Sequence, residues 1–321
     1  KTECILLNAE GAIIAQHLAP GCNPSQIGPA AARAILTEAL AALLLKAKAG
    51  QASLTVTSTL LCMAGNRAFW RETADTLNNF GVITTCDDSR PVLELATHGA
   101  PGLVLHAGTG SFIAARAPDG SIHYAGGLGW KLGDPSSGYD LGRRAIALAM
   151  LELQSSSAAT GLKSSPLVTA LQAHTGLTTA SDHSLFFYND PAANAQIAAF
   201  APLVIELATQ DCGPAQQVLA DSLTDLARQA DAVIHQLFPQ PITKLPCGVS
   251  GRILNSAPAS FALRSLASKL NWPVELQFIT TAPIEGVRRM LLAGRLFLII
   301  LIACGCSMHF FRRGSRPSSL S

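Results

Sequence analysis

The stretch GLVLHAGTGSFIAARAPDGSIHYAGGLGWKLGDPSSGYDLGRRA, residues 102–145, decides the fold of this chain. Its apolar runs at 102–107 and 112–117 are separated by the tight glycine turn GTGS. A second turn, PDGS at 118–121, leads into another apolar run, and this pattern predicts a β-meander. A glycine-rich loop and the start of a helix complete the stretch. Strands, glycine turns and a helix thus follow one another within a single segment.

The segments on either side also alternate between strands and helices. Before the stretch, the runs ECILLN and AIIAQHLA around Gly11 predict a β-hairpin, and an Ala- and Leu-rich helix follows at 29–48. After it, helices dominate from Arg143 to Phe238, and an α/β pattern returns around Gly248. We therefore predict an α/β protein whose two halves are separated by a helical insert.

Length and composition predict a folded protein of about two domains. The chain has 321 residues, and a domain holds about 150. Hydrophobic residues make up 49% and charged residues 14%, which excludes a disordered chain because such chains combine low hydrophobicity with high charge. The 23 basic and 21 acidic residues give a net charge of +2. Because nucleic-acid binding needs a basic surface, no nucleic-acid partner is expected.

Cysteine usage and the ends of the chain predict a cytoplasmic protein without a membrane span. The eight cysteines are scattered and form no CxxC motif, which favours reduced thiols. Cys304 and Cys306 are two thiols without further ligands, so no metal site is expected there. The apolar run Leu296–Cys304 is shorter than the ~20 residues that span a bilayer. This run is either an interfacial anchor or a non-native apolar extension, and the second interpretation is favoured.

Glycines are concentrated between Gly108 and Gly142, and this concentration points to a ligand site. Glycine lets the backbone approach a ligand closely, and successive N–H groups form a nest for anions. The GTGS turn at 108–111 alone fits an ordinary hairpin turn equally well. The second glycine block carries Asp134 and leads into a helix, which together with GTGS favours a site for an anionic or polyhydroxyl ligand.

Two adjacent carboxylates, Asp87 and Asp88, follow the predicted strand that ends in ITTC. The carboxyl ends of strands are where α/β sheets place ligand-binding groups. An aspartate there can serve as a general base or a magnesium ligand. Because SRPVLELA follows directly, an aspartate can also cap a helix N-terminus. Both interpretations stay open, since one aspartate can do each.

The segments ITTCDD, GLVLHAGTGS and GGLGWKLGDPSSGYDLGRRAI resemble the N-acetylglucosamine kinase and BadF/BadG/BcrA/BcrD ATPase family, part of the actin-like, hexokinase-type ATPase superfamily. The resemblance extends over about residues 1–294 and is most specific at 108–144. It implies a pair of actin-like, ribonuclease H-like α/β domains with a ligand cleft between them and a helical insert in the second. The implied partition is an N-terminal domain, a C-terminal domain and an unrelated apolar and basic tail: 1–112 completed by 283–294, 113–282, and 295–321.

The resemblance implies ATP-dependent phosphorylation of an amino sugar, N-acetylglucosamine or glucosamine, with ATP and Mg²⁺ as cofactors. Asp88 matches the family's catalytic base, which would take the proton from the sugar hydroxyl that attacks the γ-phosphate. Besides Asp88, the positions that match the sugar side are Asn23, Gly127, Gly129 and Asp134. The positions that match the ATP side, on the phosphate motifs and an adenosine segment, are Thr2, Gly108, Thr109, Gly110, Ser111, Gly248, Val249 and Gly251.

Two alternatives from the same resemblance stay open. The first is an ATPase that activates a partner enzyme and bridges a dimer with an iron–sulfur cluster, although Cys22, Cys62 and Cys86 lack a recognisable placement for it. The second is a catalytically impaired, truncated kinase homologue. The family's first strand and its DGGGT-like phosphate motif have no counterpart here, and only Lys1 and Thr2 match the end of that motif. A homodimer is also left open.

Three further positions depart from the family pattern. Leu128 stands where the sugar loop usually has a Trp, although Trp130 follows two residues later. Pro135 replaces the Glu that usually follows the loop aspartate, which removes a carboxylate for sugar hydroxyls. Cys247 replaces one glycine of the adenosine turn.

Overall fold

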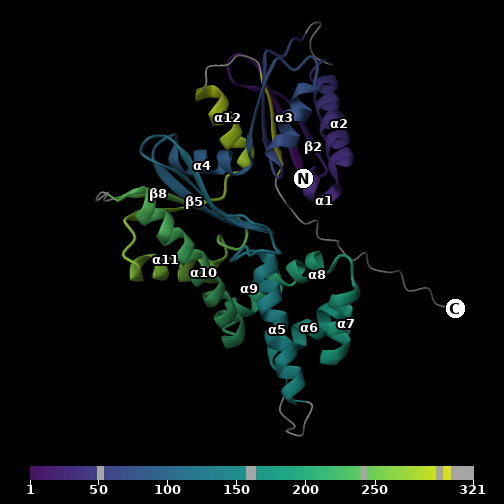
Figure 1. Ribbon diagram of the computed structural model, residues 1–321, viewed down its shortest axis with the longest axis vertical. Coiled ribbons are helices and arrows are strands. Elements are labelled where there is room, and N and C mark those ends of the chain that lie inside the picture. The colour runs from purple at the N-terminus through teal and green to yellow at the C-terminus, as the bar shows by residue number, and fades with distance from the viewer. Residues whose placement is uncertain (49–53, 157–163, 240–243, 294–298, 305–321) are drawn as a thin grey trace, which may run out of the picture.

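The computed structural model describes residues 1–48, 54–156, 164–239, 244–293 and 299–304. These residues form a mixed α/β structure with two five-stranded sheets. In Figure 1 the first sheet lies in the upper part, and the second sheet and the helical insert lie below it. The predicted α/β class with a helical insert is confirmed.

The first sheet and its helices comprise β1 (Thr2–Leu7), β2 (Ile13–Ala19), α1 (Pro24–Ile27), α2 (Pro29–Lys48), β3 (Ser58–Met63), α3 (Arg67–Asp75), β4 (Val82–Asp87), α4 (Ser89–Thr97), α12 (Pro283–Ala293) and β10 (Ile299–Cys304). The strand order is β2-β1-β10-β3-β4, with β1 antiparallel to both neighbours and β10, β3 and β4 parallel. The predicted hairpin of β1 and β2 is confirmed.

Side chains of β1 alternate between the two faces of the first sheet. Cys4 and Leu6 pack with α2, whereas Ile5 and Leu7 pack with α12. This is the two-residue period of a strand. Because both faces are covered, burial does not alternate along these strands: β1 is buried except at the partly exposed Glu3, and β3 is buried throughout.

Strand β10 lies within the range 295–321, which the sequence predicts to be an unrelated tail. It runs antiparallel to β1, with Cys304 opposite Thr2, and parallel to β3, with Ala303 opposite Cys62. The strand therefore lies in the middle of the first sheet, and this part of the expected tail belongs to the fold. Its composition, IILIAC, suits a strand that has neighbours on both sides.

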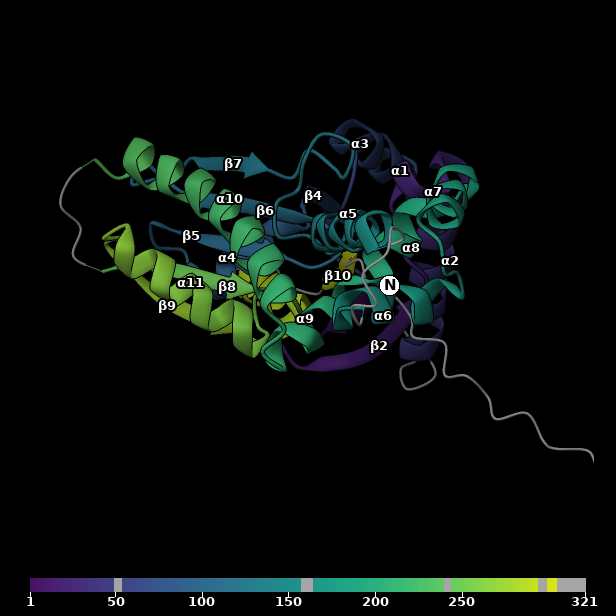
Figure 2. The ribbon, with the colours of Figure 1, turned by 90° about the horizontal axis from the view of Figure 1, so that it is seen from below.

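The second sheet comprises β5 (Gly102–Ala107), β6 (Ser111–Arg116), β7 (Ile122–Gly126), β8 (Leu245–Ser250) and β9 (Val274–Ile279). Its order is β7-β6-β5-β8-β9. The antiparallel β5–β6–β7 unit confirms the predicted meander, and β8 and β9 run parallel to β5. Figure 2 shows these strands side by side, with α10 (Gly213–Leu237) and α11 (Ala257–Lys269) along one face of the sheet.

The helical insert lies between β7 and β8 in the chain. It comprises α10 and the five helices before it, α5 (Gly138–Ser156), α6 (Pro166–Thr175), α7 (Ala180–Asn189), α8 (Ala193–Ala199) and α9 (Ala201–Thr209). These helices share one core cluster with the second sheet, in which Phe200 is fully buried. None of the helices in the described ranges combines the length and the apolar composition that a bilayer crossing needs.

Helix α4 connects the two sheets. It follows β4 of the first sheet, yet its Val92 and Ala96 pack against Val104 and Ala114 on the face of the second sheet opposite the insert. α12 packs against α4, so both helices lie between the sheets (Figure 1). The segment that carries Asp88 is therefore held between the two sheets.

Candidate active site

Three parallel strands, β10, β3 and β4, end at the same edge of the first sheet. Asp87 ends β4 and lies opposite Met63, which ends β3. Asn66 follows β3 and caps α3, where its side-chain oxygen accepts the N–H of Ala68 at 2.8 Å. Because ligand-binding groups of α/β sheets gather at the carboxyl ends of the strands, this edge is the first part of the candidate site.

Asp88 occupies the N-cap position of α4, but its side chain forms no capping hydrogen bond. Its backbone is already helical, with φ −64° and ψ −16°, whereas a capping residue is typically extended. The helix-capping interpretation is therefore wrong for Asp88. Its role as a general base stays a prediction.

Asp87 belongs to a cluster that spans both sheets. The Nε of Arg67 in α3 donates to the Asp87 carboxylate at 2.6 Å. The same guanidinium lies 5.0 Å from the ring centroid of Tyr124 in β7. Burial and a hydrogen bond with Asp87 raise the pKa of Tyr124 to about 12. Sequence reasoning missed Arg67 and Tyr124 because neither stands in a motif, and only a contact between distant segments reveals them.

The GTGS turn connects β5 to β6. The N–H of Gly108 donates to the Gly110 carbonyl at 2.9 Å, and the Gly108 carbonyl accepts the N–H of Gly138, at the start of α5, at 2.7 Å. Thr109 is partly exposed at the tip. Ser111 is buried, and its Oγ has no hydrogen-bond partner within the described residues. Since buried polar groups normally have partners, this hydroxyl marks a place where a ligand can supply one.

The glycine loop that follows β7 has a backbone that requires glycine. Gly127, Gly129 and Gly133 have φ values of 66°, 86° and 120°, in the left-handed region that side chains disfavour. Leu128 and Trp130, between them, are exposed. The two predicted sugar-side glycines thus lie on one exposed, glycine-shaped loop.

Asp134 ties this loop to the GTGS turn. Its Oδ1 accepts the N–H of Gly129 at 3.0 Å, and a Cβ on Gly110 would lie 3.2 Å from its Oδ2. Burial raises the pKa of Asp134, while backbone hydrogen bonds from Gly129, Ser111 and Leu128 oppose that shift. Because each carboxylate oxygen has two lone pairs, further donors such as sugar hydroxyls can still bind there.

The predicted adenosine segment is divided between a strand and a turn. Gly248 and Val249 lie within β8 and are buried, and a Cβ on Gly248 would lie 2.5 Å from the Cβ of Ala96. Packing against α4 therefore explains this glycine. Gly251 lies in the turn after β8 with φ 93°, and a Cβ there would lie 2.1 Å from the Ala107 carbonyl oxygen. Of the three residues, Gly251 alone lies in the turn where a nucleoside was expected.

A polar pair holds the two glycine turns together. The Nδ1 of His106, in β5, lies 2.7 Å from the Oγ of Ser250, in β8. Burial lowers the pKa of His106 to about 4, so the ring is neutral near pH 7. It also stacks on Phe112, with ring centroids 4.8 Å apart. Because His106 precedes Gly108 by two residues and Ser250 directly precedes Gly251, the pair fixes the spacing of the turns.

The two remaining predicted residues lie in the first part of the chain. Thr2 begins β1 and is buried, with its Oγ1 3.1 Å from the Sγ of Cys22. Asn23 caps α1, and its side-chain oxygen accepts the N–H of Ser25 at 3.0 Å. A Cβ on Gly65, in the loop after β3, would lie 2.7 Å from that oxygen. Asn23 therefore lies at the edge where β3 ends.

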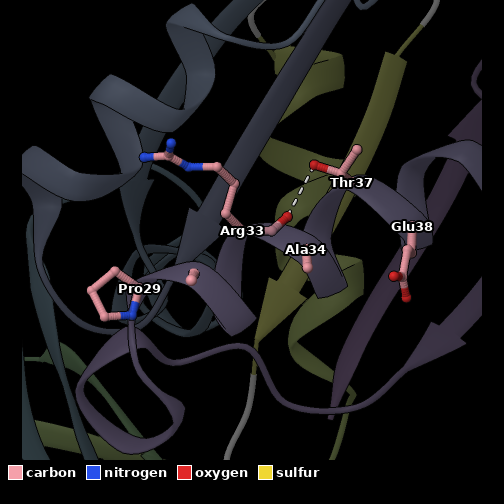
Figure 3. Close-up of a pocket in the computed structure, with 6 residues that line it drawn as sticks. Pro29, Arg33, Ala34, Thr37 and Glu38 are labelled. Carbon is pink, nitrogen blue, oxygen red and sulfur yellow. Dashed lines mark hydrogen bonds between the residues drawn. The ribbon is translucent and has the colours of Figure 1, made fainter.

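A hollow on the surface of α2 contains none of the predicted site residues. Figure 3 shows Pro29, Arg33, Ala34, Thr37 and Glu38 around it, with the Thr37 hydroxyl donating to the Arg33 carbonyl at 2.9 Å. All of its lining residues belong to this single helix, so it contributes nothing to the site between the sheets.

A model of the BadF/BadG/BcrA/BcrD ATPase family matches residues 1–286. The chain belongs to this family. No curated protein matches its sequence.

Among the solved structures that share the fold are two proteins provisionally assigned as N-acetylglucosamine kinases. The one from Chromobacterium violaceum is 24% identical, covers 90% of this chain and 98% of its own, and has a TM-score of 0.68. The one from Porphyromonas gingivalis is 20% identical, covers 90% and 95%, and has a TM-score of 0.65. These similarities confirm the predicted actin-like α/β fold with its two-domain arrangement.

The residues of this BadF/BadG/BcrA/BcrD ATPase family member fit a bound nucleotide phosphate. The buried Ser111 hydroxyl, which has no partner among the described residues, lies at a glycine turn, where backbone N–H groups favour an anion. No group of three or more His, Cys, Asp or Glu that could hold a metal occurs in the described parts of the chain. Mg²⁺ in phosphoryl-transfer sites is usually held by one or two carboxylates together with the phosphates.

Proposed function

We propose that the protein transfers the γ-phosphate of ATP to a hydroxyl of an amino sugar, N-acetylglucosamine or glucosamine. One observation carries this proposal: the Asp88 segment and the glycine loops are linked by side chains. The Arg67 guanidinium donates to Asp87 and lies over the ring of Tyr124, three residues before the glycine loop, and Asp134 ties that loop to the GTGS turn. Family membership supports the use of ATP, and the similar structures support the fold.

The roles follow from where each group lies. Asp88 accepts the proton of the attacking hydroxyl, because it matches the family's catalytic base and directly follows β4, at the edge where three parallel strands end. The GTGS backbone and the Ser111 hydroxyl bind phosphate oxygens, and Gly251 lets a nucleoside approach the backbone. Asn23 and the Gly127–Asp134 loop bind the sugar. ATP with its Mg²⁺ supplies the phosphoryl group and neutralises charge, so the protein's main contribution is positioning.

A second candidate function is the alternative that the resemblance leaves open, an ATPase that activates a partner enzyme and has no sugar substrate; membership of an ATPase family is compatible with it. Iron content and visible absorbance of anaerobically purified protein distinguish the two candidates. The kinase proposal expects a colourless preparation whose ATP turnover rises when the sugar is added. An iron-containing preparation with sugar-independent turnover would favour the activator. The predicted cytoplasmic location, homodimer and domain boundaries stay predictions.

The base is tested with Asp88→Asn and the neighbouring Asp87→Asn as matched control. We expect Asp88→Asn to abolish sugar-dependent ADP release while sugar binding, measured by calorimetry, stays detectable. Asp87→Asn removes a charge from the Arg67 ion pair and is expected to reduce turnover without abolishing it. Unchanged turnover in Asp88→Asn, or a larger loss in Asp87→Asn, would show that Asp88 is not the base.

A further inference from the structure

Two cysteines lie in contact beside the proposed base. Cys62 in β3 and Cys86 in β4 are register partners on neighbouring parallel strands, and their Sγ atoms are 3.2 Å apart. Both are free thiols. Cys86 is followed directly by Asp87 and Asp88. The proposed phosphoryl transfer uses neither sulfur, so the pair has no role in it.

The two thiols differ in exposure. Cys62 is fully buried in the cluster formed with Ile284 and Val287 of α12. Cys86 is partly exposed and packs at the edge of that cluster. Burial, reinforced by the hydrogen bond to Cys86, raises the pKa of the Cys62 thiol well above its usual range. Because Cys86 is the more exposed of the two, a small oxidant from solution meets it first. Cys62 is the neighbour that can react with the oxidised sulfur.

The backbone suits a bond between the two sulfurs. Neighbouring strands lie about 4.8 Å apart, and the Cα atoms of a disulfide are usually about 4.4–6.8 Å apart. The sulfurs are 3.2 Å apart, and an S–S bond is about 2.05 Å long, so they need to approach by about 1.1 Å. A small movement of two adjacent strands is therefore sufficient.

We propose that Cys62 and Cys86 form a reversible oxidation site that closes to a disulfide with hydrogen peroxide. The Cys86 sulfur gives two electrons to the peroxide, whose O–O bond breaks, which leaves a sulfenic acid and one water. The Cys62 sulfur then bonds to the Cys86 sulfur. The S–O bond breaks, and its hydroxide leaves with the Cys62 proton as a second water. A dithiol reverses the reaction by exchange and becomes a cyclic disulfide itself.

The consequence for activity rests on the proposed kinase function. The new bond draws the end of β4 toward β3 immediately before Asp88. A misplacement of about 1 Å at a catalytic group can cost about 100-fold in rate. Peroxide is therefore expected to reduce sugar-dependent ADP release by about 100-fold, and dithiothreitol is expected to restore it.

The site is tested by mapping cross-links in the full chain. Protein treated with hydrogen peroxide is blocked with N-ethylmaleimide, digested without reductant and analysed by mass spectrometry. Wild type is compared with Cys62→Ala, Cys86→Ser and the control Cys212→Ser, which changes the residue before α10. Wild type and control are expected to yield a Cys62–Cys86 peptide pair that dithiothreitol removes. The proposal is overturned if Cys62 and Cys86 of the wild type are both found alkylated, which means that peroxide did not oxidise them. It is also overturned if either of them is linked to Cys304 instead.

The cross-link mapping requires neither ATP nor sugar. Its result therefore does not depend on whether the kinase proposal is correct. Cys62→Ala tests whether the disulfide causes the loss of activity, because alanine has no sulfur and cannot form the bond. The replaced side chain packs toward α12. Its ADP release is expected to be insensitive to peroxide, whereas that of wild type falls. An active wild type that keeps its full rate after complete cross-linking contradicts the effect on Asp88.

Discussion

Gly251→Ala is expected to destabilise the fold and to displace the backbone next to the GTGS turn. A Cβ at this position would lie 2.1 Å from the carbonyl oxygen, 2.5 Å from the carbonyl carbon and 3.0 Å from the nitrogen of Ala107. Ordinary contact begins at 3.4 Å. All three atoms are backbone, so they cannot turn aside as a side chain does. The residue before the GTGS turn must therefore move.

The expected destabilisation has two parts. Placing alanine at φ 93° costs about 1–2 kcal/mol, because a Cβ is disfavoured in left-handed backbone. Overpacking against fixed atoms adds about 1–3 kcal/mol. Gly120→Ala is the matched control: Gly120 has φ 84°, and a Cβ there meets nothing within 4 Å. The control therefore shows the backbone cost without the overlap.

The assay is urea unfolding followed by circular dichroism, with the free energy of unfolding compared among wild type and the two variants. Gly251→Ala is expected to lose about 1–3 kcal/mol more than Gly120→Ala. Nucleotide affinity is expected to fall in Gly251→Ala alone, because the displaced backbone leads into the GTGS turn. Equal losses of stability in the two variants would refute the close approach of Gly251 to Ala107.

Three other predictions concern the core and the contacts between elements. His106 has a pKa of about 4 in the folded chain, against 6.5 when free. Between pH 7 and pH 5 the imidazole therefore becomes protonated in the unfolded chain and stays neutral in the folded chain. Through this residue the unfolding free energy of the wild type falls by up to about 2 kcal/mol over that range. His106→Asn should lack that loss in urea titrations at the two pH values, and an unchanged pH dependence would contradict the buried neutral ring. Phe200→Ala removes a fully buried ring and should lower the free energy of unfolding by about 3–5 kcal/mol. Phe261→Ala, at a residue that is 77% exposed, should change it by no more than about 0.5 kcal/mol. Similar losses in the two variants would refute this placement of the core. Tyr124→Phe removes the hydroxyl whose pKa is raised by burial and by Asp87 and should raise the KM for sugar more than the KM for ATP in steady-state kinetics. An effect confined to ATP would contradict the place of Tyr124 beside the glycine loop.

The meander of the second sheet is predictable from the sequence because its signals are local. Alternating apolar runs and glycine turns fix each hairpin within a few residues. The helical insert is less predictable. The composition of 192–209 predicts one helix, and this prediction is wrong. α8 ends before Phe200 and α9 has Pro202 in its first turn, because proline cannot continue the preceding helix. α7 buries His183 alone, so it has no apolar stripe to reveal it.

Contacts between distant segments explain most of what the sequence does not predict. Apolar composition identifies 299–304 as a run that avoids water, but its partners, β1 and β3, come from the other end of the chain. The role of Gly248 as a packing glycine depends on its contact with Ala96 of α4, and no local pattern indicates that contact. The same holds for the Arg67–Tyr124 contact. The glycine turns and Asp88 were visible because the residue types themselves suggest their chemistry.

Phosphorus NMR of the reaction mixture tests the central claim most directly. Purified protein is incubated with ATP, Mg²⁺ and N-acetylglucosamine or glucosamine, and the spectrum is followed with time. We expect the γ-phosphate resonance of ATP to disappear while ADP and a sugar phosphomonoester appear together, and we expect no phosphomonoester from Asp88→Asn. ADP accompanied by inorganic phosphate alone, at a rate that the sugar does not change, would contradict phosphoryl transfer to a sugar.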